Sequence, residues 1–109
     1  MGYYVNIVAY NKHHMDKPPK TICSFYQENA ADNTIAKYIY EYMRDKGPTL
    51  DKSVILQFMT VVDNALHYGN SLFTSASKYD LKFLSHTLHS TFDNYKWDRY
   101  IVCVEYTNC

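Results

Sequence analysis

The two ends of the chain share an alternation of apolar and polar positions. It runs from Tyr3 to Tyr10 near the N-terminus and from Arg99 to Tyr106 near the C-terminus. A period of two with β-branched and aromatic side chains is typical of a half-buried strand. The apolar positions would form one face of a shared sheet: Val5, Ile7, Ala9, Tyr100, Val102, Val104 and Tyr106. We therefore expect the last strand to pair beside the first.

A polar segment follows the first strand and leads to a second one. Residues 11–20 are polar and include Pro18-Pro19, which removes two backbone donors and disfavours helix. Thr21 to Gln27 then has the composition of a strand. We expect this strand to be antiparallel to the first, across the intervening loop.

The middle of the chain has the 3.6-residue periodicity of amphipathic helices. A first helix is predicted from a cap at Asp32 or Asn33 to a stop at Gly47-Pro48, because glycine accepts the left-handed conformation and proline cannot continue the turn. Its apolar stripe is Ile35, Tyr38, Ile39, Tyr42 and Met43.

Two further helices are predicted before the last strand. One begins at Thr49 or Asp51 and ends at Gly69, and the other runs from Ser77 or Lys78 to Asn94. The apolar positions of the former are Val54, Ile55, Phe58, Val61, Val62 and Ala65, with Leu56, Met59 and Leu66 broadening the arc. The stripe of the latter is Leu81, Leu84, Leu88, Phe92 and Tyr95.

These elements predict one α+β domain over residues 1–109, in the order ββαααβ. A small three-stranded sheet would be covered on one face by three helices. The length of 109 residues suits one core and is too short for two.

Charge and cysteine usage narrow the classes of function. Eleven basic side chains balance eleven acidic ones, so binding to nucleic acid or to an anionic membrane would need a local patch. No stretch is long and apolar enough to span a bilayer and the start lacks the features of a signal peptide, so we expect a cytoplasmic protein without membrane contact. The cysteines, Cys23, Cys103 and Cys109, have no CxxC spacing, which favours reduced thiols.

The sequence contains little that predicts catalysis. None of its three glycines belongs to a phosphate-binding loop, and no GxSxG motif positions a serine nucleophile. We therefore expect neither an enzyme nor a cofactor. The alternative is a small metal-dependent enzyme, because His86 and His89 are three residues apart on a predicted helix and could reach one ion. A simpler interpretation pairs His89 with Asp93 on the helix surface.

The loop after the first strand is the most basic segment of the chain. Lys12, His13, His14, Lys17 and Lys20 could contact phosphates or an acidic protein surface. The same residues would also suit an ordinary solvated hairpin loop.

The face of the sheet away from the helices is the other candidate surface. It would carry Tyr4, Asn6, Val8, Tyr10, Arg99, Ile101, Cys103 and Glu105. Aromatic side chains on a sheet can stack on unpaired bases, but the chain has no RNP1-like segment and no net charge. The same face could dock a protein or a second copy of the chain, because tyrosine is enriched at interfaces.

Composition and size resemble those of a class of small proteins. With twelve tyrosines, 109 residues and no catalytic signature, the chain resembles the single-domain proteins, anti-CRISPR proteins among them, by which AT-rich phages and other mobile elements bind and inhibit host machinery. This resemblance implies a non-enzymatic inhibitor that occupies the surface of a host protein. A nucleic-acid-binding domain is the alternative. The predicted contact residues are Tyr4, Asn6, Tyr10, Lys12, His13, His14, Lys17, Lys20 and Arg99.

Overall fold

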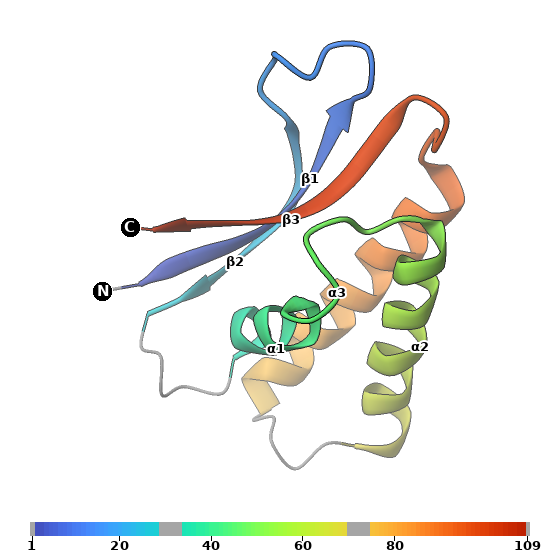
Figure 1. The fold of residues 1–109 in the computed structure, drawn as a ribbon. Helices are drawn as coiled ribbons and strands as arrows, with labels where there is room; N and C mark the ends of the chain where they lie inside the picture. The colour runs from blue at the N-terminus through green and yellow to red at the C-terminus, as the bar shows by residue number, and fades with distance from the viewer. Residues whose placement is uncertain (1, 29–33, 70–74, 109) are drawn as a thin grey trace.

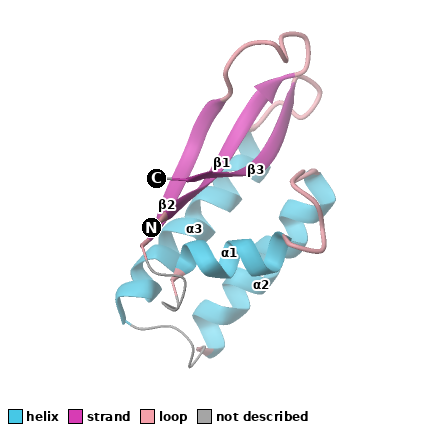
Figure 2. Ribbon diagram, turned by 60° about the vertical axis from the view of Figure 1, so that its left-hand side comes forward, coloured by secondary structure: helices cyan, strands magenta, loops and turns pink. Residues whose placement is uncertain are grey.

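Three antiparallel strands form a sheet in the order β2-β1-β3, with all three helices on one of its faces (Figures 1 and 2). The structure is a computed structural model that describes residues 2–28, 34–69 and 75–108. The elements are β1 (Tyr3–Asn11), β2 (Lys20–Gln27), α1 (Ile35–Met43), α2 (Lys52–Tyr68), α3 (Ser75–Asn94) and β3 (Tyr100–Asn108). The predicted α+β class and the order ββαααβ are confirmed.

The first strand lies at the centre of the sheet. β3 pairs with it from Tyr3 opposite Asn108 to Asn11 opposite Tyr100, so both ends of the chain lie at one end of the sheet (Figure 1). On the other side, the register with β2 shifts between Ile7 and Val8. The extra residue in β2 is Ile22, which packs against the core.

A short extended segment lines the outer edge of β3. The backbone N–H of Val104 donates to the carbonyl of Pro48 at 2.7 Å, and the N–H of Leu50 donates to that of Val102 at 2.8 Å. Gly47, with a φ of 78°, turns the chain from α1 into this segment. The segment therefore satisfies backbone groups that an edge strand would otherwise leave to solvent.

One hydrophobic core lies between the sheet and the helices. The apolar face predicted for β1 and β3 supplies Val5, Ile7, Val102 and Val104 to it. Phe58 of α2 is fully buried and stacks on Tyr42 of α1, with ring centroids 4.4 Å apart. The core therefore joins α1, α2 and the sheet through large side chains.

The predicted helix boundaries were partly wrong. Asp32 and Asn33 lie outside the described residues, and the N-cap of α1 is Thr34, whose hydroxyl accepts from the N–H of Lys37 at 3.4 Å and donates to the buried Gln27 side chain. Asp51, one of the two predicted starts, caps α2 and accepts from the N–H of Val54 at 2.8 Å. α3 begins at Ser75, earlier than predicted.

Two predicted core positions of α2 are on the surface. Leu56 is 49% exposed and Val61 is 38% exposed, although the neighbouring Ile55 and Val62 are fully buried. Successive helical residues point about 100° apart, so Leu56 and Val61 fall outside the buried row of the helix. None of the described helices is long and apolar enough to cross a membrane.

Candidate functional site

The face of the sheet opposite the helices carries a continuous set of side chains from all three strands. Tyr4, Asn6 and Tyr10 lie on it, as the alternation predicts. We call this surface the outer face: Tyr4, Asn6, Val8, Tyr10, Ser24, Tyr26, Ile101, Cys103, Glu105 and Thr107. Ser24, Tyr26 and Thr107 were not among the predicted contact residues, although the same alternation in β2 and an extension of it in β3 would have placed them there.

An aromatic pair occupies one end of the outer face. Tyr4 and Tyr26 are opposite each other in register, and their ring centroids lie 4.9 Å apart. Their side chains are 42% and 44% exposed. The two rings therefore contact each other and remain partly accessible to solvent.

A polar row crosses the sheet beside this pair. The Ser24 hydroxyl donates to Asn6 Oδ1 at 2.6 Å, and Asn6 Nδ2 donates to the Thr107 hydroxyl at 3.1 Å. The Asn6 amide thus links β2, β1 and β3, and these contacts orient it.

A longer side-chain contact, between Tyr10 and Glu105, spans the next cross-strand pair of the outer face. The Tyr10 hydroxyl donates to Glu105, although Tyr10 faces Ile101 in register. The two side chains therefore reach along the sheet and across the pair that lies between them, Val8 and Cys103. Val8 was expected on an exposed face and is instead only 3% exposed, and the register places it beneath the span of this contact.

The Tyr10 contact also sets the acid-base properties of its neighbours. The hydrogen bond to Glu105, together with burial, raises the pKa of the Tyr10 phenol. Burial raises the pKa of the Cys103 thiol; a hydrogen bond with Thr49 opposes this rise, and the Glu105 carboxylate adds to it. Both groups are therefore neutral near pH 7.

The predicted start of the last strand at Arg99 was one residue too early. Arg99 lies in the turn before β3, where its carbonyl accepts from the N–H of Lys12 at 2.8 Å. The Lys12 ammonium donates to the carbonyl of Trp97 at 2.8 Å. The turn before β3 is therefore tied to the loop after β1.

These bonds hold the loop after β1 beside the turn before β3, at the end of the sheet away from the chain termini (Figure 1). The predicted basic residues are exposed there, and the sequence did not indicate that Lys96 joins them. We call this cluster the basic tip: Lys12, His13, His14, Lys17, Lys20, Lys96 and Arg99. Asp16 and Asp98 lie in the same two turns and offset part of its charge.

The pairing of His89 with Asp93 was also wrong. A ring nitrogen of His89 lies 2.7 Å from Asp63 Oδ2 of α2, and the Ser85 hydroxyl donates to Asp63 Oδ1 at 2.6 Å. Partial burial would raise the pKa of Asp63, but the hydrogen bonds with Ser85 and His89 outweigh it and lower that pKa. Asp63 thus joins α2 to α3 through one carboxylate.

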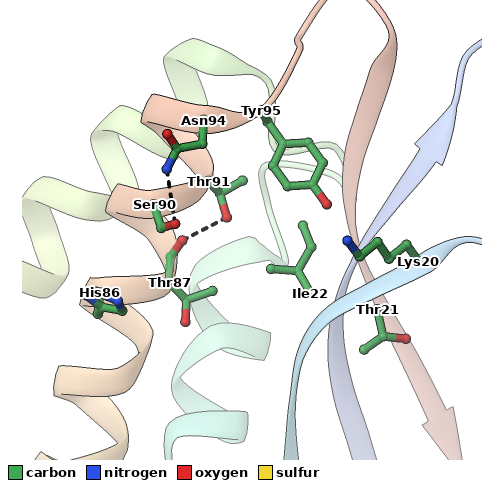
Figure 3. A pocket seen from close by; sticks show the side chains of 9 residues that line it. All are labelled: Lys20, Thr21, Ile22, His86, Thr87, Ser90, Thr91, Asn94 and Tyr95. Atoms are coloured by element: carbon green, nitrogen blue, oxygen red, sulfur yellow. Dashed lines mark hydrogen bonds between the residues drawn. The ribbon is translucent and has the colours of Figure 1, made fainter.

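His86 and His89 face different neighbours and do not converge. His86 lines a groove of about 350 Å³ between the start of β2 and α3, where it lies with Lys20 and Tyr95 (Figure 3). Within the described part of the chain, no three His, Cys, Asp or Glu side chains gather closely enough to hold a metal ion.

The hydroxyl groups in that groove are partly engaged by their own helix. Thr91 donates to the carbonyl of Thr87 at 2.8 Å, and Asn94 donates to Ser90 at 3.4 Å (Figure 3). The groove therefore offers hydroxyl and amide groups beside one ammonium and one imidazole, with no carboxylate among its lining residues.

Comparison with protein-family models, with curated proteins and with solved structures finds no match to this chain. Its function has to be inferred from its own residues.

Proposed function

We propose that the chain is a non-enzymatic protein-binding module that docks on a protein partner through the outer face. The observation that carries this proposal is the set of cross-strand contacts that hold the face in place: the Tyr4 and Tyr26 rings, the row through Asn6, and the Tyr10 bond to Glu105. Side chains that are already ordered lose less conformational entropy on binding.

The chemistry of the outer face suits a protein better than a nucleic acid. Glu105 is the one charged side chain that the described strands place on it, and a carboxylate repels phosphate. The basic side chains lie at the far end of the sheet. Tyrosine is enriched at protein interfaces, and Tyr4 and Tyr26 are exposed on the outer face.

The proposal also covers the effect of binding on the partner. We infer from the composition and size of the chain that its partner is a host protein and that binding inhibits it, as the resemblance to phage inhibitors implies. Occupation of a partner's surface needs no catalytic group on the chain itself.

The test compares two exposed tyrosines, one on the outer face and one on a helix. Tyr26 is 44% exposed on the outer face, and Tyr79 is 81% exposed on α3. A tagged chain should capture a specific protein from a lysate of its source cell, and Tyr26→Ala should lose that protein while Tyr79→Ala retains it. Retention by a folded Tyr26→Ala variant, or equal loss in both, would place the contact elsewhere. Capture of a second copy of the chain would identify the face as a dimer interface.

Nucleic-acid binding by the basic tip is the second candidate. The observation that favours it is that the fold brings Lys96 and Arg99 beside the predicted basic loop. Such binding would weaken steeply as salt rises, because it releases counterions from the phosphates. A mobility-shift titration with a single-stranded oligonucleotide at low salt tests it, with Lys12→Gln and Arg99→Gln expected to weaken binding and Lys82→Gln on α3 as the control. No shift at low salt would exclude it.

A further inference from the structure

Three tyrosines meet at the end of the sheet where the termini lie, on the face that bears the helices. Tyr3 of β1 and Tyr106 of β3 are neighbours there, because Val5 is the residue opposite Tyr106. Tyr40 of α1 packs against both, with ring centroids 6.2 Å from Tyr3 and 5.2 Å from Tyr106. Tyr40 and Tyr106 are each 43% exposed, so the rings reach solvent at the edge of the core.

The Tyr40 and Tyr106 pair separates two adjoining hollows. Both rings line a hollow of about 400 Å³ that Tyr3 also lines, and both line a second hollow of about 350 Å³ that Pro48 also lines. We call the two hollows together the tyrosine groove. Each has the volume of a ligand pocket, and the shared edge-to-face pair forms the ridge between them.

The hydroxyls of Tyr3 and Tyr106 in the groove are hydrogen-bond donors at neutral pH. Burial, followed by the neighbouring tyrosine hydroxyls, raises the pKa of both Tyr3 and Tyr106. The groove therefore combines flat aromatic walls with neutral donors.

The charged side chains differ between the two hollows. Lys37 and Glu41 both line the first hollow and balance each other. Arg44 is the one charged residue among those that line the second. A ligand that spans both hollows therefore meets a net positive charge at its Pro48 end.

An extended proline-rich peptide has the complementary chemistry. A polyproline II helix makes no internal hydrogen bonds, so its carbonyl groups are available to donors, and its rings pack against aromatic side chains. Its three-residue repeat places every third side chain on one face, so prolines three residues apart can enter neighbouring hollows. Because this helix is preformed in solution, little conformational entropy is lost when it binds.

We propose that the tyrosine groove binds a proline-rich segment in the polyproline II conformation, with an acidic residue of that segment beside Arg44. This inference rests on the proposed protein-binding function, since the segment would belong to a protein, but it uses a surface separate from the outer face. The two surfaces can therefore be tested by different variants.

The test is a titration of the isotope-labelled chain with synthetic peptides, followed by amide chemical shifts. The probes are a run of nine prolines with a terminal Glu, the same run with Lys in its place, and a Gly-Ser peptide of equal length. The Glu peptide should shift the amides of Tyr3, Tyr40 and Tyr106 and bind more tightly than the Lys peptide. Tyr40→Ala should weaken binding about tenfold, and Tyr40→Phe should weaken it less.

Two control variants separate this inference from the function it rests on. Tyr79→Ala and Tyr26→Ala should both bind the Glu peptide as the unaltered chain does, even though Tyr26→Ala is expected to lose the captured protein. The inference is overturned if millimolar proline peptide gives no shifts in the groove, or if the Gly-Ser peptide gives the same ones. It is also overturned if folded Tyr40→Ala binds with unchanged affinity.

Discussion

Tyr10 and Glu105 are hydrogen-bonded across the Val8 and Cys103 pair, although neither is the register partner of the other. The contact spans Val8, which is only 3% exposed although it lies on the side of the sheet that no helix covers. It also adds a third cross-strand link to those made by Tyr4 and Asn6. The side chains of the outer face therefore hold one another in place through contacts between neighbouring strands.

The first prediction concerns the reactivity of the Cys103 thiol, which the Tyr10–Glu105 contact spans. In a Cys109→Ser background, Cys103 should react slowly with a disulfide reagent. Cys23 should not react until the chain unfolds, because it is 6% exposed and burial raises its pKa to about 12. Tyr10→Ala should speed the reaction of Cys103 several-fold by removing the side chain that reaches across it, and Tyr79→Ala should not. Equal rates for Cys103 in both variants would show that Tyr10 does not cover it.

The second prediction concerns stability against pH. The pKa of Asp63 is lower in the folded protein than its ordinary value of 3.8. The ionised carboxylate therefore stabilises the fold above that value, and this stabilisation is lost as the pH falls through the folded pKa. Asp63→Asn should lower the free energy of unfolding by about 1 kcal/mol at neutral pH, because the contacts are partly exposed. The difference should shrink towards zero below the folded pKa.

Urea unfolding at neutral and at acid pH measures this difference. Asp93→Asn is the matched control, since Asp93 is the exposed aspartate that the sequence paired with His89. It should have little effect at either pH. A loss of stability for Asp93→Asn equal to that for Asp63→Asn would contradict the interhelical pairing.

The sequence predicted the elements of this fold well because each depends on local periodicity. The alternation around Val5 and Val102 identified β1 and β3, and the cap at Asp51 identified the start of α2. Contacts between elements depend on register and packing angle, which periodicity does not contain. The partner of His89 lies on another helix, and the burial of Val8 requires the alignment of β1 with β3.

The candidate site was predicted only in part, for the same reason. Alternation was sufficient to place Tyr4, Asn6 and Tyr10 on one face. It could not show that Arg99 would fall in the preceding turn, because strand ends depend on the bonds that Lys12 makes there. The tyrosine groove was not predicted at all, since Tyr40 meets Tyr106 only once α1 has packed on the sheet.

The third prediction concerns the close packing of Gly2 against Gln27 and Tyr26. Gly2 is buried, and a Cβ added to it would lie 2.6 Å from the carbonyl oxygen of Gln27 and 2.6 Å from the Tyr26 ring. Gly2→Ala should therefore destabilise the fold by about 1 to 3 kcal/mol, measured by urea unfolding. In a Tyr26→Ala background the effect should be smaller but still present, because the carbonyl remains. An Ala at Gly2 that leaves stability unchanged would show that this approach is not tight.

The most direct test of the central claim, that the outer face is the partner contact, is site-specific photo-crosslinking. A benzophenone amino acid replaces Tyr26 in one sample and Tyr79 in the other, and both are irradiated in a lysate of the source cell. The account predicts a discrete protein adduct from the Tyr26 position and none from Tyr79. An adduct from Tyr79 alone, or the same adduct from both positions, would contradict it.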